Sequence, residues 1–173
     1  VFDLPLRIRA TIGAHRQPVV SANVVGVLEG SDPKLKHEYV VLSAHLDHLG
    51  VGAPINGDAI YNGAMDNASG VASVLDIMGR LKAQRPKRSV VALLVTAEEK
   101  GLLGSRFFSR RPTMDRNAIV ANLNFDMPLP LWPLKTVIAG GEGESTLGQA
   151  ARAVAAQQGL ATTPDPLPER NSF

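Results

Sequence analysis

The sequence of 173 residues contains no cysteine, few aromatic residues and almost no net charge. Without cysteine there are no disulfides and no thiolate ligands, so any metal ion must be held by histidine and carboxylate side chains. Aromatic residues make up 5% of the chain and the formal net charge is +2, which argues against a nucleic-acid partner. No apolar run approaches the roughly 20 residues of a membrane span.

The length suits one domain with a core of its own, which we place over residues 1–173. The first residue is Val1 rather than methionine, and no signal peptide is visible at this end. We therefore expect a processed or excised piece of a longer protein.

Short apolar runs alternate with amphipathic stretches along the chain, which predicts an α/β fold with a mixed, mostly buried β-sheet flanked by helices. Between His45 and Gly70 a glycine-rich stretch shows little periodicity, as functional loops of that length often do. It leads into a helix that Asn67 or Ser69 is suited to cap. The predicted strands cover residues 4–12, 23–29, 39–44, 89–96, 118–125 and 136–139, and the predicted helices cover 71–82, 101–110 and 145–158.

Residues of the metal-binding type directly follow three of the predicted buried strands. His45 and Asp47 come after the first, the pair Glu98 and Glu99 after the second, and Asp126 after the third. Ligands bind at the carboxyl ends of strands in open α/β sheets, so these side chains are expected to meet at one edge.

Taken singly, each of these residues has an ordinary structural interpretation. A histidine at a strand end is usually a surface residue, and an acidic pair is usually solvated. However, Glu98 and Glu99 repel each other unless a cation is near, and Asp126 lies in an apolar setting where an unpaired carboxylate is costly. Asp66, in a run of small residues before the helix, is by itself a plain helix cap. The residues make better sense together, as a metal site.

Four stretches in this order resemble the M28 family of zinc peptidases, the bacterial co-catalytic aminopeptidases. No single stretch is decisive, but four with matching order and spacing form a specific signal. The resemblance implies that family's three-layer α/β fold. The matching stretches are residues 44–47, 63–70, 96–99 with 101–105, and 124–126.

The resemblance also implies a set of metal ligands. Asp66 is expected to bridge two zinc ions and to be followed by a cis peptide bond. His45 and Asp126 are expected to complete the protein ligands of the first ion, with Asp47 orienting His45. Glu99 is expected to bind the second ion.

The reaction that the resemblance implies is hydrolysis of a peptide bond, most readily removal of an N-terminal residue from a peptide substrate. A zinc-bound water attacks the scissile carbonyl, and Glu98 acts as the general base that transfers its proton to the leaving amine. The resemblance further implies export to the periplasm or the medium. It leaves the oligomeric state open.

One part of the family pattern is absent from this sequence. The second zinc ion ordinarily has a histidine ligand from a loop far downstream, and no histidine follows His48 here. We expect the first zinc site to be complete, the second to be weak or empty, and the C-terminal part of the family domain to be missing. For His48 itself we expect a supporting or solvent-facing position, while nothing favours Asp165 or Glu169 as substitute ligands.

Two other functions remain open at this point. The missing histidine favours a metal-binding domain that acts through interaction without catalysis, although retention of Glu98 beside Glu99 argues against it. A glutaminyl-cyclase-like acyltransferase shares the family fold, and Asp47, Glu98 and Glu99 do not separate it from a peptidase.

Overall fold

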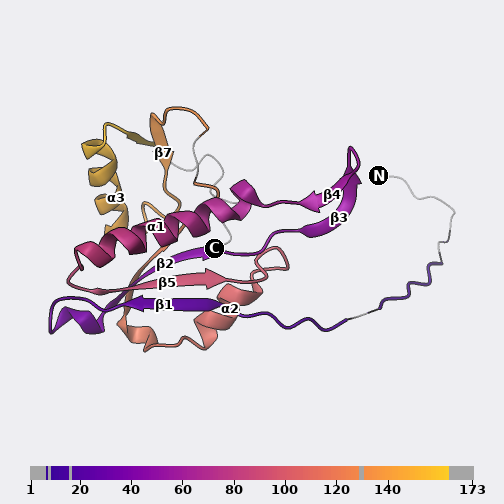
Figure 1. The fold of residues 1–173 in the computed structure, drawn as a ribbon, viewed down its shortest axis with the longest axis horizontal. Coiled ribbons are helices and arrows are strands. Elements are labelled where there is room, and N and C mark those ends of the chain that lie inside the picture. The colour runs from indigo at the N-terminus through magenta and orange to yellow at the C-terminus, as the bar shows by residue number, and fades with distance from the viewer. Residues whose placement is uncertain (1–6, 8, 16, 129–130, 164–173) are drawn as a thin grey trace.

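The computed structural model describes residues 7, 9–15, 17–128 and 131–163. The predicted strand at 4–12 lies partly outside these ranges, and its described residues adopt no regular structure, so that prediction is wrong there. Alternating apolar residues form a strand only where a neighbouring strand satisfies the hydrogen bonds of their backbone N–H and carbonyl groups. Ile12 is instead exposed, in a segment that runs away from the sheet (Figure 1).

A four-stranded mixed sheet forms the centre of the molecule, in the order β1-β5-β2-β6. Strands β2, β5 and β6 are parallel, and β1 pairs with β5 in the antiparallel direction. The sequence predicts all four strands, with ends that differ by at most one residue. They are β1 (Val24–Leu28), β2 (Tyr39–His45), β5 (Ser89–Val95) and β6 (Ile119–Asn124).

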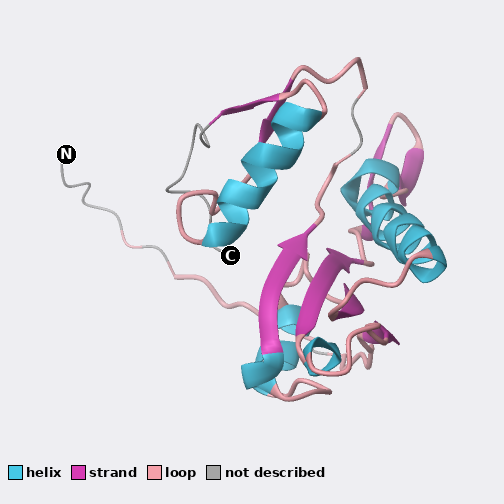
Figure 2. Ribbon diagram, turned by 90° about the vertical axis from the view of Figure 1, so that its left-hand side faces the viewer, coloured by secondary structure: helices cyan, strands magenta, loops and turns pink. Residues whose placement is uncertain are grey.

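Helices cover both faces of this sheet, which confirms the predicted α/β architecture (Figures 1 and 2). Helix α1 (Ser69–Ala83) places Val74 against Leu42 and Ala44, and helix α2 (Leu103–Arg110) places Phe108 in the core on the other face. Because β2 and β5 contribute alternate residues to both cores, these two strands are the most buried elements. Their ends are therefore rigid supports for side chains that project beyond the sheet.

The glycine-rich stretch contains a β-hairpin that sequence reasoning missed. Strands β3 (Gly50–Ile55) and β4 (Asp58–Tyr61) pair antiparallel and project away from the sheet (Figure 1). Asn56 and Gly57 join them, both with positive φ, as the tight turns favoured in hairpins require. The Asn-Gly pair was the available signal, and the many neighbouring glycines obscured the strands around it.

A second small unit follows β6, with β7 (Thr136–Ile138) and β8 (Ala161–Thr163) running parallel and α3 (Thr146–Gln157) between them. The predicted strand at 136–139 and helix at 145–158 are confirmed, whereas β8 was not predicted. The remaining short elements are the 3₁₀ turns η1 (Leu35–His37) and η3 (Arg116–Ala118) and the π-helical turn η2 (Ala64–Ala68). Within the described ranges, no helix has both the length and the apolar composition of a membrane span.

Candidate metal centre

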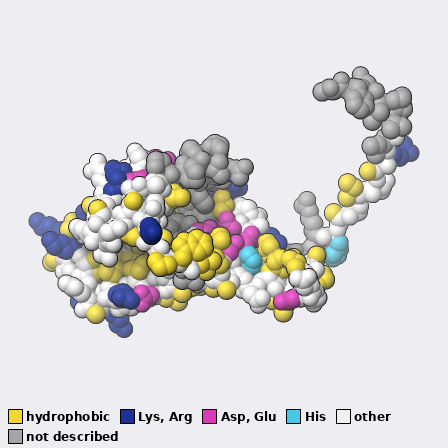
Figure 3. Space-filling model, turned by 90° about the horizontal axis from the view of Figure 1, so that it is seen from above, with side chains coloured by type: hydrophobic (Ala, Val, Ile, Leu, Met, Phe, Trp, Pro, Cys, Tyr) yellow, Lys and Arg dark blue, Asp and Glu magenta, His cyan; other side chains and the backbone are white. Residues whose placement is uncertain are grey.

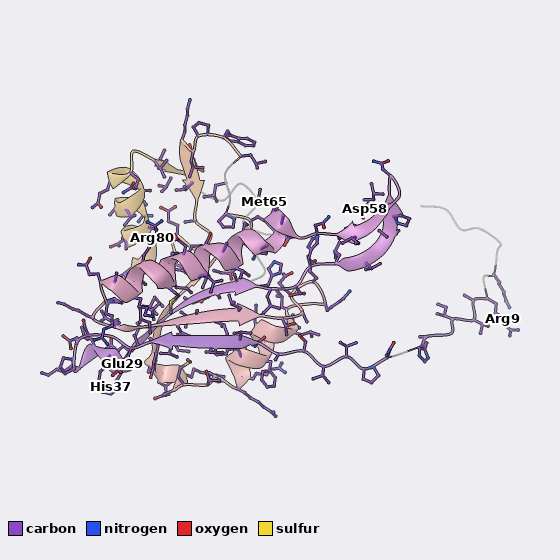
Figure 4. The ribbon with its side chains drawn as sticks, in the orientation of Figure 1. Arg9, Glu29, His37, Asp58, Met65 and Arg80 are labelled. Atoms are coloured by element: carbon purple, nitrogen blue, oxygen red, sulfur yellow. The ribbon has the colours of Figure 1, made fainter. Side chains whose placement is uncertain are left out.

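The carboxyl ends of the three parallel strands bring the predicted ligand residues to one edge of the sheet. His45 is the last residue of β2, Glu98 and Glu99 lie in the turn after β5, and Asp126 follows β6. Asp66 comes from η2, whose chain continues directly into α1 at the same edge. Its peptide bond to the next residue is cis. Met65, the residue before Asp66 in η2, lies just ahead of α1 (Figure 4).

Among the described residues, two groups of three side chains have ligand atoms within 4.8 Å of one another, and both include Asp66. The first group is His45, Asp66 and Asp126. Its imidazole Nε2 lies 3.0 Å from Asp66 Oδ1 and 3.5 Å from Asp126 Oδ1, and the imidazole itself is almost fully buried. These three side chains are those that the resemblance assigns to a first ion.

The orientation of His45 is set by the backbone of Asp47. His45 Nδ1 lies 2.9 Å from the Asp47 carbonyl oxygen and 3.8 Å from the carboxylate, so the predicted carboxylate contact is replaced by a backbone one. A carbonyl oxygen can only accept, so Nδ1 carries the hydrogen in this contact. Nε2 is thereby left as the free lone pair that faces the two carboxylates.

The Asp47 carboxylate instead joins the end of β2 to the turn after β5. It accepts hydrogen bonds from the backbone N–H groups of Glu98 at 3.0 Å and Glu99 at 3.3 Å. A further backbone bond, from Leu46 N–H to the Val95 carbonyl at 2.8 Å, holds the same two segments together. Two turns that are 51 residues apart in the chain are thus joined directly by hydrogen bonds.

The second group of ligand atoms is His48, Asp66 and Glu99. His48 Nδ1 lies 2.9 Å from Glu99 Oε1 and 3.7 Å from Asp66 Oδ2. Sequence reasoning expected a supporting or solvent-facing position for His48, and in the structure its ring nitrogen contacts the Glu99 carboxylate. Its neighbour Asp47 was recognised, but the direction of a loop side chain depends on local dihedrals that hydrophobic periodicity does not report. Asp165 and Glu169, which nothing in the sequence favours as substitute ligands, lie outside the described residues.

Asn67 supports the first group and was considered only as a helix cap. Its buried side-chain oxygen accepts the N–H of Gly70 in the first turn of α1, at 3.0 Å, and that of Met127, at 3.2 Å. Its amide donates to the carbonyl of Phe125 at 2.9 Å. Asn67 therefore binds the residues on both sides of Asp126 to the start of α1, next to Asp66. The other predicted cap, Ser69, donates to Met65 and has no such role.

The electrostatics of the site favour bound protons or a cation. Burial lowers the pKa of His45, but the charges of Asp126, Glu98 and Asp66 and the Asp47 carbonyl outweigh it and raise the pKa above 6.5. Burial raises the pKa of Glu98, and the charges of Glu99, Asp126 and Asp47 add to this against the opposing effect of His45. The carboxylates gathered at the strand ends thus contribute to both pKa shifts, while burial is the largest cause of the shift at Glu98.

An apolar groove of about 490 Å³ borders the ligands on the side of α1 and the hairpin. Leu46, Tyr61, Val71 and Leu75 line it together with Asp47 and His48. From above, acidic side chains and a histidine gather beside exposed hydrophobic surface in this part of the molecule (Figure 3). Charged ligands and apolar surface therefore lie side by side.

Residues 23–173 match the family model described as peptidase family M28. The chain belongs to peptidase family M28. Among curated relatives it is similar to a probable leucine aminopeptidase 2 of Aspergillus oryzae, with 38% identity over 106 residues. That match covers 61% of this chain and 19% of the relative, so the chain spans about a fifth of the curated relative that it matches.

Two solved structures show the same fold for this M28 chain. A zinc aminopeptidase from Bacillus subtilis superimposes with a TM-score of 0.64 at 24% identity, covering 82% of this chain and 34% of that one. A glutaminyl cyclase from Bacteroides thetaiotaomicron gives a TM-score of 0.65 at 20% identity, covering 82% and 56%. The two similarities are equal in strength, so the fold alone does not choose between their reactions.

Proposed function

We propose that this M28 chain carries the site of a zinc-dependent peptidase that removes N-terminal residues from peptides. The observation that supports this most is the pair of ligand groups that share Asp66 and lie beside Glu98. The names of a similar leucine aminopeptidase and a similar zinc aminopeptidase point to the same reaction. Apolar surface next to the ligands suits the binding of a peptide side chain.

The donor atoms fit zinc. A zinc ion prefers four-coordinate sites with imidazole nitrogen and carboxylate oxygen ligands, and His45, Asp66 and Asp126 supply one nitrogen and two oxygens that converge. The bound ion would supply Lewis-acid activation of the scissile carbonyl and of the attacking water. Asp66 belongs to both groups, which suits a carboxylate that bridges two ions.

Glu98 is the residue we assign as general base. Its backbone is held against Asp47, and its raised pKa brings it closer to the working pH at which a carboxylate both accepts and returns a proton. Glu98 accepts a proton from the attacking water and delivers it to the nitrogen of the scissile peptide bond, which leaves as the new amino terminus of the shortened peptide. Because Glu98 is outside both ligand groups, its carboxylate is free for this transfer.

The test is Glu98→Gln in the full chain, assayed with amino-acid anilides and short peptides. Loss of a general base lowers the rate by about 10²–10⁴-fold, and zinc content is expected to stay at the wild-type level because Glu98 is not a ligand. Glu29→Gln is the matched control, since Glu29 lies at the opposite end of the sheet (Figure 4). Wild-type activity in Glu98→Gln would refute the proposal.

The two alternative functions give different results in the same experiments. A purely interacting domain predicts no turnover by the wild-type protein, and zinc analysis then separates a metal-binding interaction domain from one without metal. A glutaminyl-cyclase-like enzyme predicts a cyclised product, without hydrolysis, from peptides that begin with glutamine. Export of the enzyme also belongs to the proposal, and activity confined to the cytoplasmic fraction would contradict it.

A further inference from the structure

We propose that Asn23 is a positioning residue for Glu98, because its side-chain amide binds both ends of the turn that carries this carboxylate. The inference rests on the proposed function, in which Glu98 is the general base. Asn23 belongs to neither group of candidate ligands and lies 73 residues before Thr96, the first residue of the turn. Its effect on the reaction is therefore exerted through the backbone of the turn.

The position of Asn23 follows from the topology of the sheet. Strand β1 runs antiparallel to β5, and its first residue, Val24, pairs with Leu94 near the end of β5. Asn23 precedes Val24, so it lies beside the point where the chain leaves β5 and turns towards α2 (Figure 1). The start of β1 is thus brought to the edge of the sheet at which Glu98 lies.

The amide of Asn23 makes one hydrogen bond to each end of this turn. Its Oδ1 accepts from the N–H of Thr96 at 3.0 Å, and its Nδ2 donates to the carbonyl of Gly104 at 2.8 Å. The two ends are also bonded to each other, since the Gly104 N–H donates to the Thr96 carbonyl at 2.9 Å. A Cβ on Gly104 would collide with the Thr96 backbone and with Asn23 Oδ1, so this close contact requires glycine.

The turn between these ends needs external support because its backbone is strained. Ala97 and Leu102 have φ values of 54° and 61°, in the left-handed region that side chains with a Cβ disfavour. Such residues persist only where the surrounding structure holds them. Asp47 holds the middle of the turn by its backbone N–H groups, and Asn23 holds the two ends. Glu98 directly follows Ala97, so relaxation of the turn would displace the base.

A purely structural role for Asn23 would be to fasten β1 to its neighbours, as Ser89 does at the opposite end of β5. Ser89 Oγ is buried, accepts from the N–H of Gly30 at 3.0 Å and donates to the carbonyl of Lys36 at 2.6 Å. Loss of either side chain is expected to lower the free energy of unfolding, because buried hydrogen bonds are lost. Only the loss of Asn23 should alter the turn and the rate.

The experiment measures kcat and KM of the zinc-loaded full chain for Asn23→Ala, alone and combined with Glu98→Gln. Ser89→Ala is the matched control for lost stability. Ser21→Ala is the control for a lost side-chain contact, since it removes only the 2.7 Å hydrogen bond between the hydroxyl groups of Ser21 and Thr96. Hydrogen exchange of the metal-free variants, followed amide by amide, reports the turn, and urea unfolding reports the fold.

In Asn23→Ala we expect kcat to fall by about 10–100-fold and KM to change by less than about threefold, because a displaced base weakens catalysis while substrate binding is kept. The Thr96 amide should exchange at least about fivefold faster relative to amides in the middle of β5. Combined with Glu98→Gln, Asn23→Ala should lower kcat no further, since the two changes act on one group. Both controls should keep the wild-type kcat and the wild-type exchange of the turn.

The inference is overturned by wild-type kcat in Asn23→Ala, by an equal fall of kcat in Ser89→Ala or beside Glu98→Gln, or by unchanged exchange of the Thr96 amide. Should Asn23→Ala fail to fold, Asn23→Asp takes its place. It keeps the acceptor for the Thr96 N–H and loses only the donor to Gly104, so a smaller fall of kcat is expected and wild-type kcat again overturns the inference. These outcomes leave the proposed function standing, whereas wild-type activity in Glu98→Gln alone refutes both.

Discussion

The two ligand groups at the sheet edge share Asp66 but are built differently. In the first, His45 is the final residue of a buried strand, its Nδ1 is used by a backbone carbonyl, and its Nε2 faces the carboxylates. In the second, His48 belongs to a loop, is partly exposed and presents Nδ1 instead. The position of the histidine in the first group is therefore fixed by the sheet, whereas in the second group it depends on contacts between turns.

Each group nevertheless has a supporting residue next to one of its ligands. Asn67 follows Asp66 and binds the backbone on both sides of Asp126. Asp47 precedes His48 and binds the backbone of Glu99. In both cases a side chain next to one residue of the group hydrogen-bonds to the backbone of the segment that carries another: Asn67 to the segment of Asp126, and Asp47 to the segment of Glu99. The comparison shows how candidate ligands from distant segments are brought together by hydrogen bonds to backbone N–H and carbonyl groups.

The largest effect is expected from Asp66→Asn, which removes the charge that the two groups share. Both ions should be lost, and the peptidase rate should fall by about a thousandfold or more, because metal activation contributes several kcal/mol. Zinc analysis together with the rate measures this. Retention of one tightly bound ion would show that the groups are independent, and the comparison above would fail.

A smaller and selective effect is expected from Asp47→Ala. The change removes the bonds to Glu98 and Glu99 but leaves the backbone carbonyl that orients His45. We therefore expect the second ion to bind about 10–100-fold more weakly, as for other residues that support ligands, with the first ion little affected. Stepwise zinc titration measures both affinities. Asp58→Ala, at the tip of the hairpin (Figure 4), is the control. Equal weakening of both ions would contradict the distinction.

The smallest effect is a pH dependence that belongs to the first group. In the metal-free protein the raised pKa of His45 means that the folded chain holds this proton more tightly than the unfolded chain. Its contribution to stability is complete below pH 6.5 and is lost as the pH rises through the raised value. The raised pKa of Glu98 likewise makes the free energy of unfolding fall as the pH rises, beginning above its ordinary pKa of 4.5.

Urea unfolding of the metal-free protein as a function of pH checks this, with His45→Asn as the comparison. The variant should lose the decline in unfolding free energy above pH 6.5, because it lacks the titrating imidazole. An equal decline in both proteins would assign the effect to another group.

The part of the centre carried by strand ends could be predicted from the sequence. The buried runs before His45, Glu98 and Asp126 determine where β2, β5 and β6 end, and parallel strands bring those ends together. The M28 resemblance matched four segments in the right order. Both signals consist of the periodicity of apolar residues and the spacing of motifs, which can be recognised in the sequence itself.

The rest depends on side-chain direction in loops, which has no periodic signal. The Asp47 carboxylate was expected on His45 and instead accepts backbone hydrogen bonds from another turn. His48 was set aside because nothing in the sequence shows that Gly63 leaves it room beside Glu99. The hairpin was hidden for a similar reason, since its Asn56-Gly57 turn lies among glycines that also suit an irregular loop.

The hydrogen bonds of Asn67 have a consequence for the coupling between folding and metal binding. They belong to the same buried structure that joins α1 to the end of β6, so they hold Asp66 and Asp126 side by side as part of the fold. An ion that binds only this folded form raises stability by mass action, by about 2.7 kcal/mol at a concentration 100 times its dissociation constant. Under the proposed function, the melting temperature of the protein is therefore expected to rise with the free zinc concentration.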